Sequence, residues 1–150
     1  MLIWEFDVVL VGINWKKKKH WTMLALDNRK KPSTLTHLDS LKGFSCVTRE
    51  NVLRCIGAFK HYMERCANET GAKLNTGEWK VQCCRAGIPS QDTNDCGVSV
   101  CTMGNCMAWN KPFDWDAKHG KVLRADIVSA LKKKWVPEPK TRAELSKDTV

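Results

Sequence analysis

Apolar residues in this chain follow two spacings, and each spacing predicts one kind of secondary structure. Short apolar runs, several of them rich in β-branched residues, are typical of strands, whereas apolar residues three and four positions apart indicate a helix with one buried face. Together they describe a chain that mixes helices and strands. We expect strands at residues 7–14, 21–26, 33–38 and 78–84, and helices at residues 49–67, 96–109 and 122–135.

Two of these helices have a well-defined apolar face. Thr48 can cap the first helix, and Gly71 lies beyond its end. The last helix is followed by residues 136–150, where two prolines and mixed charges predict a loose tail. We therefore expect one domain over residues 1–135. The buried faces are expected to contain Val52, Ile56, Phe59, Met63 and Cys66 in the first helix, and Leu123, Ile127 and Leu131 in the last.

The turn-forming residues 27–32 predict a hairpin between the second and third strands. If the turn centres between Arg29 and Lys30, His20 lies directly opposite Asp39. Opposed side chains have Cβ atoms about 4.5–5.5 Å apart, which suits a bond between an imidazole and a carboxylate. Asp27 lies seven residues along the same strand from His20, about 23 Å away. Asp39 is therefore the better partner for His20.

Length and composition limit the class of protein. The chain has 150 residues, of which 43% are hydrophobic, and it carries a net charge of +9. No apolar run approaches the roughly 20 residues that span a bilayer, and the N-terminus lacks the order of charges of a secretory signal. The eight cysteines contain no CxxC pair, and the spacing of those in the Cys96 helix does not suit a single metal ion. We expect free thiols, no metal or cofactor, and an intracellular protein of the nucleus or cytoplasm.

A candidate nucleophile stands where a polar loop enters the second helix. Cys96 and Gly97 begin this helix, where free N–H groups and the helix dipole favour an anion. A nucleophilic thiol needs a base and an orienting partner for that base, and His20 with Asp39 can supply both. The side-chain amide of Gln91 and the backbone N–H of Cys96 could stabilise the oxyanion of an acyl transfer.

These residues resemble a known family. His20-Trp21, the hairpin that ends in Asp39-Ser40-Leu41, and Gln91 ahead of Asp95-Cys96-Gly97-Val98 are similar to the motifs of the ubiquitin-like-protein-specific cysteine proteases. This family includes the SUMO-deconjugating enzymes of the Ulp/SENP type and is related in fold to the adenovirus endopeptidase. The resemblance covers about residues 7–131. Because the chain begins just ahead of the His-Trp strand, we expect the N-terminal part of the family domain to be missing.

The resemblance implies a fold and an activity. The fold would be α+β and papain-like or adenain-like, with a mostly antiparallel mixed sheet packed by helices and the nucleophile at a helix N-terminus. Cys96 would be the nucleophile, His20 the general base, Asp39 its orienting partner and Gln91 an oxyanion donor. Trp21 would pack on the diglycine tail of a ubiquitin-like modifier, SUMO-like or related, whose conjugates or precursor would be the substrate.

Two other functions remain open. The short N-terminus would also suit a catalytically inactive remnant, or a domain that only binds the modifier. The charge of +9 attracts acidic partners, and a basic nucleic-acid-binding domain is the third hypothesis. Because the sequence has no helix-turn-helix, zinc or RNP pattern, nucleic acid is the least favoured partner.

Overall fold

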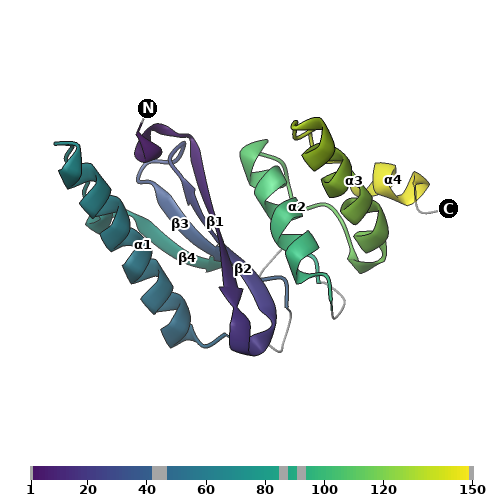
Figure 1. The fold of residues 1–150 in the computed structure, drawn as a ribbon, viewed down its shortest axis with the longest axis horizontal. Helices are drawn as coiled ribbons and strands as arrows, with labels where there is room; N and C mark the ends of the chain where they lie inside the picture. Colours follow the sequence, from purple (N-terminus) through teal and green to yellow (C-terminus); the bar gives the residue numbers. More distant parts are fainter. Residues whose placement is uncertain (1, 42–46, 85–87, 91–93, 149–150) are drawn as a thin grey trace.

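The computed structural model describes residues 2–41, 47–84, 88–90 and 94–148. A four-stranded sheet lies between helices, with α1 on one face, α2 on the other, and α3 and α4 beyond α2 (Figure 1). The strands are β1 (Val8–Trp15), β2 (His20–Asp27), β3 (Thr34–Leu38) and β4 (Lys80–Cys84). The α-helices are α1 (Arg49–Glu69), α2 (Cys96–Ala108), α3 (Gly120–Lys133) and α4 (Arg142–Lys147), and the 3-10 turns are η1 (Ile3–Glu5), η2 (Lys16–Lys18), η3 (Thr76–Glu78) and η4 (Ala117–His119).

The sheet has the order β1-β2-β3-β4 and is mixed. The first two pairs are antiparallel, because short turns connect β1 to β2 and β2 to β3. The β3–β4 pair is parallel, and the long connection that a parallel pair requires contains α1. The fold is therefore α+β, as the resemblance implied, with a sheet that is mostly antiparallel.

Strand β2 lies in the interior of the sheet and is buried on both faces. Its side chains alternate between two cores, so Leu24 and Leu26 pack with α1 whereas Met23 and Ala25 pack with α2. This explains why residues 23–26 form a continuous apolar run rather than an alternating one. The α1 core contains Val9, Leu24, Leu26, Leu35, Val47, Val52, Ile56, Phe59, Met63 and Trp79, and the α2 core contains Met23, Ala25, Leu38, Ile88, Val98, Met103, Cys106, Trp115, Leu123 and Leu145.

Helix periodicity predicted α1 well and α3 less well. Thr48 caps α1 by accepting a hydrogen bond from the backbone N–H of Asn51, as expected. Ala67, rather than Cys66, completes the buried face at its C-terminal end. In α3, Leu123 is buried as expected, but Leu131 is 74% exposed. The apolar spacing of Leu131 is therefore misleading, because the end of α3 has little of the protein to pack against.

The segment after residue 135, where we expected a loose tail, contains helix α4. Thr141 accepts from the backbone N–H of Glu144, and the Glu144 carboxylate accepts from the backbone N–H of Thr141, which forms a capping box. Leu145 has no exposed surface and belongs to the α2 core. The segment thus contributes to the core through one leucine, which a tail rich in proline and charge does not suggest.

Candidate active site

A buried hydrogen bond joins His20 to Asp39. The Nε2 atom of His20 lies 2.9 Å from Oδ1 of Asp39, and the two side chains are 3% and 0% exposed. The same Oδ1 accepts a hydrogen bond from the backbone N–H of Leu41, at 2.9 Å. Because a carboxylate oxygen only accepts, Nε2 of His20 carries the proton in this contact. In the neutral imidazole, Nδ1 is then the basic nitrogen.

The strand register that we expected for this pair is wrong, although the two side chains meet. The β2–β3 ladder pairs Met23 with Leu38 and Asp27 with Thr34, a shift of two residues from the expected pairing. A shift of two residues keeps each side chain on the same face of the sheet, whereas a shift of one would reverse it. His20 is the first residue of β2 and Asp39 follows β3, so the pair lies where the ladder ends.

A second polar group lies beside His20 along the strand. The indole N–H of Trp15 donates to Oγ1 of Thr22 at 2.8 Å, and Nε2 of His37 lies 3.1 Å from the same oxygen. Thr22 and His37 are buried, at 0% and 3% exposed. These contacts link β1, β2 and β3 next to the histidine and hold its strand in place. His37 is therefore engaged with Thr22, on the second arm of the hairpin.

Cys96 is the first residue of α2, as the Cys-Gly pair predicted, and it is 9% exposed. Helix α2 runs in the same direction as β2. A methyl group at Gly104 would lie 3.6 Å from Sδ of Met23, and Nη2 of Arg29 donates to the carbonyl of Met107. Along the helix axis, Cys96 lies about 12 Å before Gly104. Along the strand, His20 lies about 10 Å before Met23. Cys96 and His20, the first residues of α2 and β2, therefore lie at the same end of the two elements, which Figure 1 shows next to each other.

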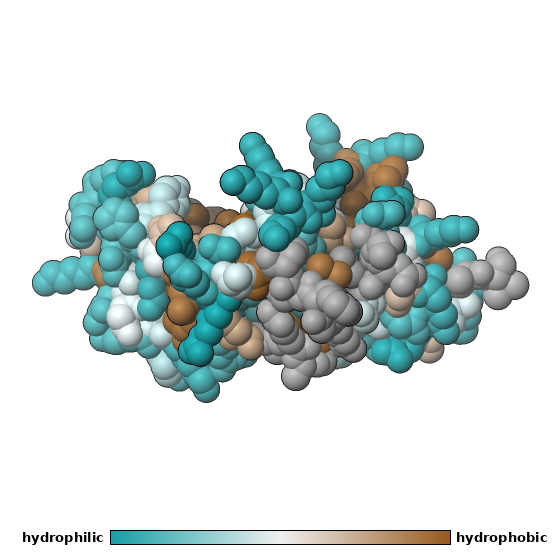
Figure 2. Space-filling view, turned by 90° about the horizontal axis from the view of Figure 1, so that it is seen from below, coloured by the Kyte–Doolittle hydropathy of each residue, from teal (hydrophilic) through white to brown (hydrophobic). Residues whose placement is uncertain are grey.

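Gln91 and Trp21 are the other two site residues that we expected, and the structure describes only Trp21. Gln91 lies outside the described residues. Trp21 is 40% exposed, and its ring lies close to Gly12 of β1, where a methyl group would be 3.8 Å from Cζ3. A partly exposed indole next to the buried histidine can contact a ligand. The surface at this end of the molecule is mainly hydrophilic with small apolar areas (Figure 2).

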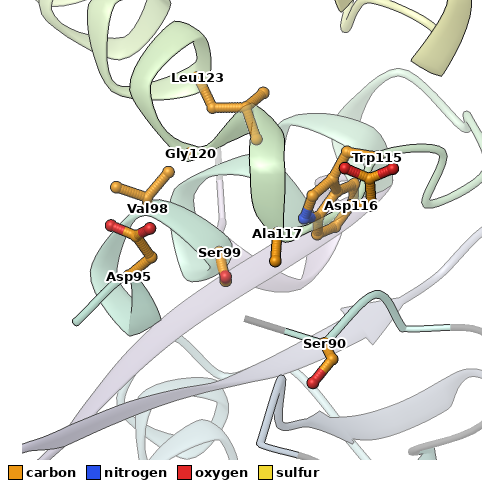
Figure 3. Close-up of a pocket in the computed structure, with 9 residues that line it drawn as sticks. All are labelled: Ser90, Asp95, Val98, Ser99, Trp115, Asp116, Ala117, Gly120 and Leu123. Atoms are coloured by element: carbon orange, nitrogen blue, oxygen red, sulfur yellow. The ribbon is translucent and has the colours of Figure 1, made fainter. Parts of the chain in front are cut away.

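Asp95 and Arg124 form an ion pair that the sequence analysis did not identify. Asp95 precedes Cys96, and its Oδ1 accepts from Nη2 of Arg124 in α3. The carboxylate lies against Gly120, and both residues line a small pocket between α2 and α3 (Figure 3). The partners are 29 residues apart in the sequence. In the sequence, the position of the Asp95 carboxylate directly before the expected nucleophile is the feature that could have indicated this ion pair.

Helix α2 carries two further cysteines, Cys101 and Cys106, besides Cys96. All six cysteines with described side chains are free. Burial raises the pKa of the Cys101 thiol, and burial together with Asp114 raises the pKa of Cys106 from 9.0 to about 11. A raised pKa disfavours the nucleophilic thiolate. Although Cys106 shares a helix with Cys96, its surroundings are those of a structural thiol.

The raised pKa of Cys106 predicts selective alkylation. At pH 8 we expect iodoacetamide to modify Cys106 about 100-fold more slowly than an unperturbed thiol, because the thiolate fraction falls about tenfold for each pKa unit. The measurement is mass spectrometry of peptides after timed labelling. Cys83, which is exposed, is the control, and in denaturant both thiols should react at similar rates. Equal labelling of Cys83 and Cys106 in the folded protein would contradict the prediction.

The described residues contain neither a candidate metal site nor a helix that could span a membrane. Among the described residues, no group of three or more His, Cys, Asp or Glu side chains could hold a metal ion. None of the helices in the described part of the chain is both long enough and apolar enough to cross a bilayer.

Comparisons with known proteins identify the family. The model of the "Ulp1 protease family, C-terminal catalytic domain" matches residues 1–146. Similar solved structures include the SUMO protease Ulp1 with its catalytic cysteine oxidised to a sulfenic acid (TM-score 0.60, 20% identity, 89% of this chain and 56% of that one). They also include the sulfonic acid form (TM-score 0.56, 21% identity, 83% and 52%). The chain thus spans about half the length of these structures.

A search of curated proteins finds no match. The structural likeness extends over most of the chain and agrees with the α+β fold described above. The family match covers the His20-Trp21, Asp39 and Asp95-Cys96-Gly97 motifs and reaches into the segment that contains α4. Because the family model matches nearly the whole chain, this chain belongs to the Ulp1 protease family.

Proposed function

We propose that the chain is a thiol protease or isopeptidase that cleaves after the C-terminal glycine of a ubiquitin-like modifier, SUMO-like or related. One observation supports this most strongly. The buried hydrogen bond between His20 and Asp39 lies at the end of the sheet where α2 begins with Cys96. A nucleophile, a base and an acid that orients the base are the three parts that thiol catalysis needs. Membership of a protease family gives this arrangement its chemical meaning.

The hydrogen-bond pattern assigns a role to each nitrogen of His20. Asp39 accepts the Nε2 proton, so Nδ1 is the atom that takes the proton of the Cys96 thiol. The carboxylate then stabilises the imidazolium that results. The N-terminal end of α2 favours the thiolate, since its first N–H groups and the helix dipole attract negative charge. Among the described residues no hydrogen bond joins Cys96 to His20. Substrate binding is therefore expected to shorten the distance between the Cys96 sulfur and Nδ1 of His20.

The reaction proceeds through a thioester. The Cys96 thiolate attacks the carbonyl carbon of the terminal glycine, and the backbone N–H of Cys96, with Gln91, donates to the oxyanion. The C–N bond breaks as the imidazolium of His20 gives its proton to the leaving amine. Water then attacks the thioester, His20 takes a proton from the water, and the modifier leaves with a free carboxylate. The proton returns to the Cys96 sulfur.

The exposed indole of Trp21 suits a narrow, extended substrate. It adjoins His20 in sequence, is partly exposed, and its ring lies beside Gly12 of β1. We assign Trp21 to binding of the diglycine tail, since two residues without side chains can lie flat against an aromatic face. The partner would be the modifier, its precursor or its conjugates. The free cysteines support an intracellular location, in the nucleus or the cytoplasm.

The experiment that tests this function uses modifiers that carry a C-terminal vinyl sulfone. The folded protein is incubated with a panel of such probes, SUMO and ubiquitin included, and examined for a mass increase of one modifier. We expect a covalent adduct on Cys96 with at least one probe. Cys96→Ala should form none, because it removes the sulfur that we propose as the nucleophile.

The control variant is Cys101→Ala, which removes another thiol from the same helix and should leave adduct formation unchanged. A folded protein that reacts with none of the modifiers would contradict the proposal. If it still binds one of them, the chain is a modifier-binding domain of the same fold rather than a protease.

A further inference from the structure

The Asp95 carboxylate lies in an unusual position for a residue that precedes a helix. Aspartate at this position normally accepts a hydrogen bond from a backbone N–H in the first turn. Asp95 makes no such bond, and its backbone (φ −104°, ψ 16°) is outside the extended conformation common at this position. Its carboxylate instead reaches Arg124 of α3. The Asp95 side chain, which is at the position to cap α2, therefore binds α3 instead.

Gly120 makes room for this arrangement. A methyl group at residue 120 would lie 2.5 Å from Oδ2 and 3.3 Å from Cγ of Asp95, too close for both to remain in place. Gly120 has ordinary helical backbone angles (φ −53°, ψ −39°), so its conformation does not require glycine. What requires glycine is the space that the carboxylate occupies. Arg124 and Gly120 are one helical turn apart and form one receptor on α3.

The position of this carboxylate affects the chemistry of the neighbouring thiol. If Asp95 capped α2, its negative charge would lie beside the Cys96 sulfur and oppose the thiolate. Arg124 reduces this effect, because it neutralises the carboxylate and draws it toward α3. An arginine 59% exposed can do this at little structural cost.

We propose that Arg124 is a positioning residue for the reaction of Cys96, which holds the Asp95 carboxylate against Gly120 and away from the start of α2. This inference rests on the proposed function of Cys96 as a nucleophile. It makes α3 part of the active-site support, although α3 itself contributes no group to the reacting atoms. The arginine acts through Asp95 alone, so its effect disappears when the carboxylate is absent.

The test measures hydrolysis of a fluorogenic amide of the reactive modifier, together with the alkylation rate of Cys96 by iodoacetamide. For Arg124→Met we expect kcat to fall about tenfold, less than the 10²–10³ lost with an oxyanion donor, while KM stays within about twofold. Cys96 alkylation should slow by a similar factor. Arg54→Met is the control, since it removes an exposed ion pair with Glu50 on α1. It should change neither rate.

Two further variants separate this mechanism from alternatives. Gly120→Ala keeps both charges but displaces the carboxylate, and it should lower kcat and slow alkylation as Arg124→Met does. Gly57→Ala, where nothing lies within 4 Å of the added methyl group, is its control. In a background of Asp95→Ala, Arg124→Met should have no further effect, because the two residues act as one unit.

The results distinguish the failure of this inference from the failure of the proposed function. If the unmodified chain hydrolyses the modifier but Arg124→Met lowers kcat equally with and without the Asp95 carboxylate, Arg124 does not act through Asp95. A rise in KM alone would make it a substrate contact. Thermal unfolding of each variant is measured in parallel, and a loss of activity that follows only a loss of folded protein would also overturn the inference.

Discussion

Asp39→Ala is expected to lower kcat/KM for the modifier substrate by on the order of 10³–10⁴, the range found when the acid of a catalytic triad is removed. The variant leaves Nε2 of His20 buried without its carboxylate partner. His20 can then adopt the other tautomer, which places the proton on Nδ1 and removes the basic nitrogen that we propose as the acceptor of the thiol proton. The measurement is steady-state hydrolysis at a temperature well below the unfolding transition of the variant.

Asp39→Asn separates the charge of this residue from its geometry. The backbone N–H of Leu41 donates to Oδ1, so an asparagine is held with its carbonyl oxygen in the place of Oδ1. It still accepts the Nε2 proton, whereas the negative charge is lost and an amide NH2 group replaces Oδ2. We therefore expect Asp39→Asn to retain more activity than Asp39→Ala. Equal activity of Asp39→Ala and the unmodified protein would show that His20 is not oriented by Asp39.

Leu145→Ala is expected to lower the free energy of unfolding by about 2–4 kcal/mol, a typical cost of removing a fully buried leucine side chain. Leu145 has no exposed surface and packs in the α2 core. Helix α4 has only six residues and depends on this contact, since a helix of that length is not stable by itself. Chemical denaturation measures the effect.

The chain offers a matched control for this variant. Leu131 also lies on a helix near the C-terminus, but it is 74% exposed. Leu131→Ala should change the free energy of unfolding by no more than about 0.5 kcal/mol, as is usual for surface positions. A result in which both variants behave alike would mean that α4 does not belong to the folded core.

Local patterns predicted much of the fold. The capping threonine and the three- and four-residue spacing located α1, and the Cys-Gly pair located the start of α2. The same spacing wrongly predicted that Leu131 is buried. Periodicity shows which residues share a helix face, but it does not show whether another element packs against that face. Helix α4 was missed because its only buried residue, Leu145, carries no periodic signal.

Only the part of the candidate site that depends on strand alternation was predictable from the sequence. His20 and Asp39 lie on neighbouring strands, and alternation alone brings them to one face even when the register is shifted by two residues. The contact between Asp95 and Arg124 depends on how α3 lies against α2, which no local pattern encodes. The expected register would have placed Thr22 directly opposite His37; in the observed ladder Leu24 pairs with His37, and the hydrogen bond between Thr22 and His37 is diagonal.

The division of the interior into two cores has a consequence for inactivation by heat. His20 and Asp39 are fixed to the sheet, whereas Cys96 is carried by α2, which rests on the sheet through Met23, Ala25 and Leu38. Loosening of that one layer separates sulfur from imidazole while α1 and the strands beneath it stay folded. Such partial opening is ordinary in proteins. The activity that we propose is therefore expected to fall reversibly on warming before the overall helix content declines.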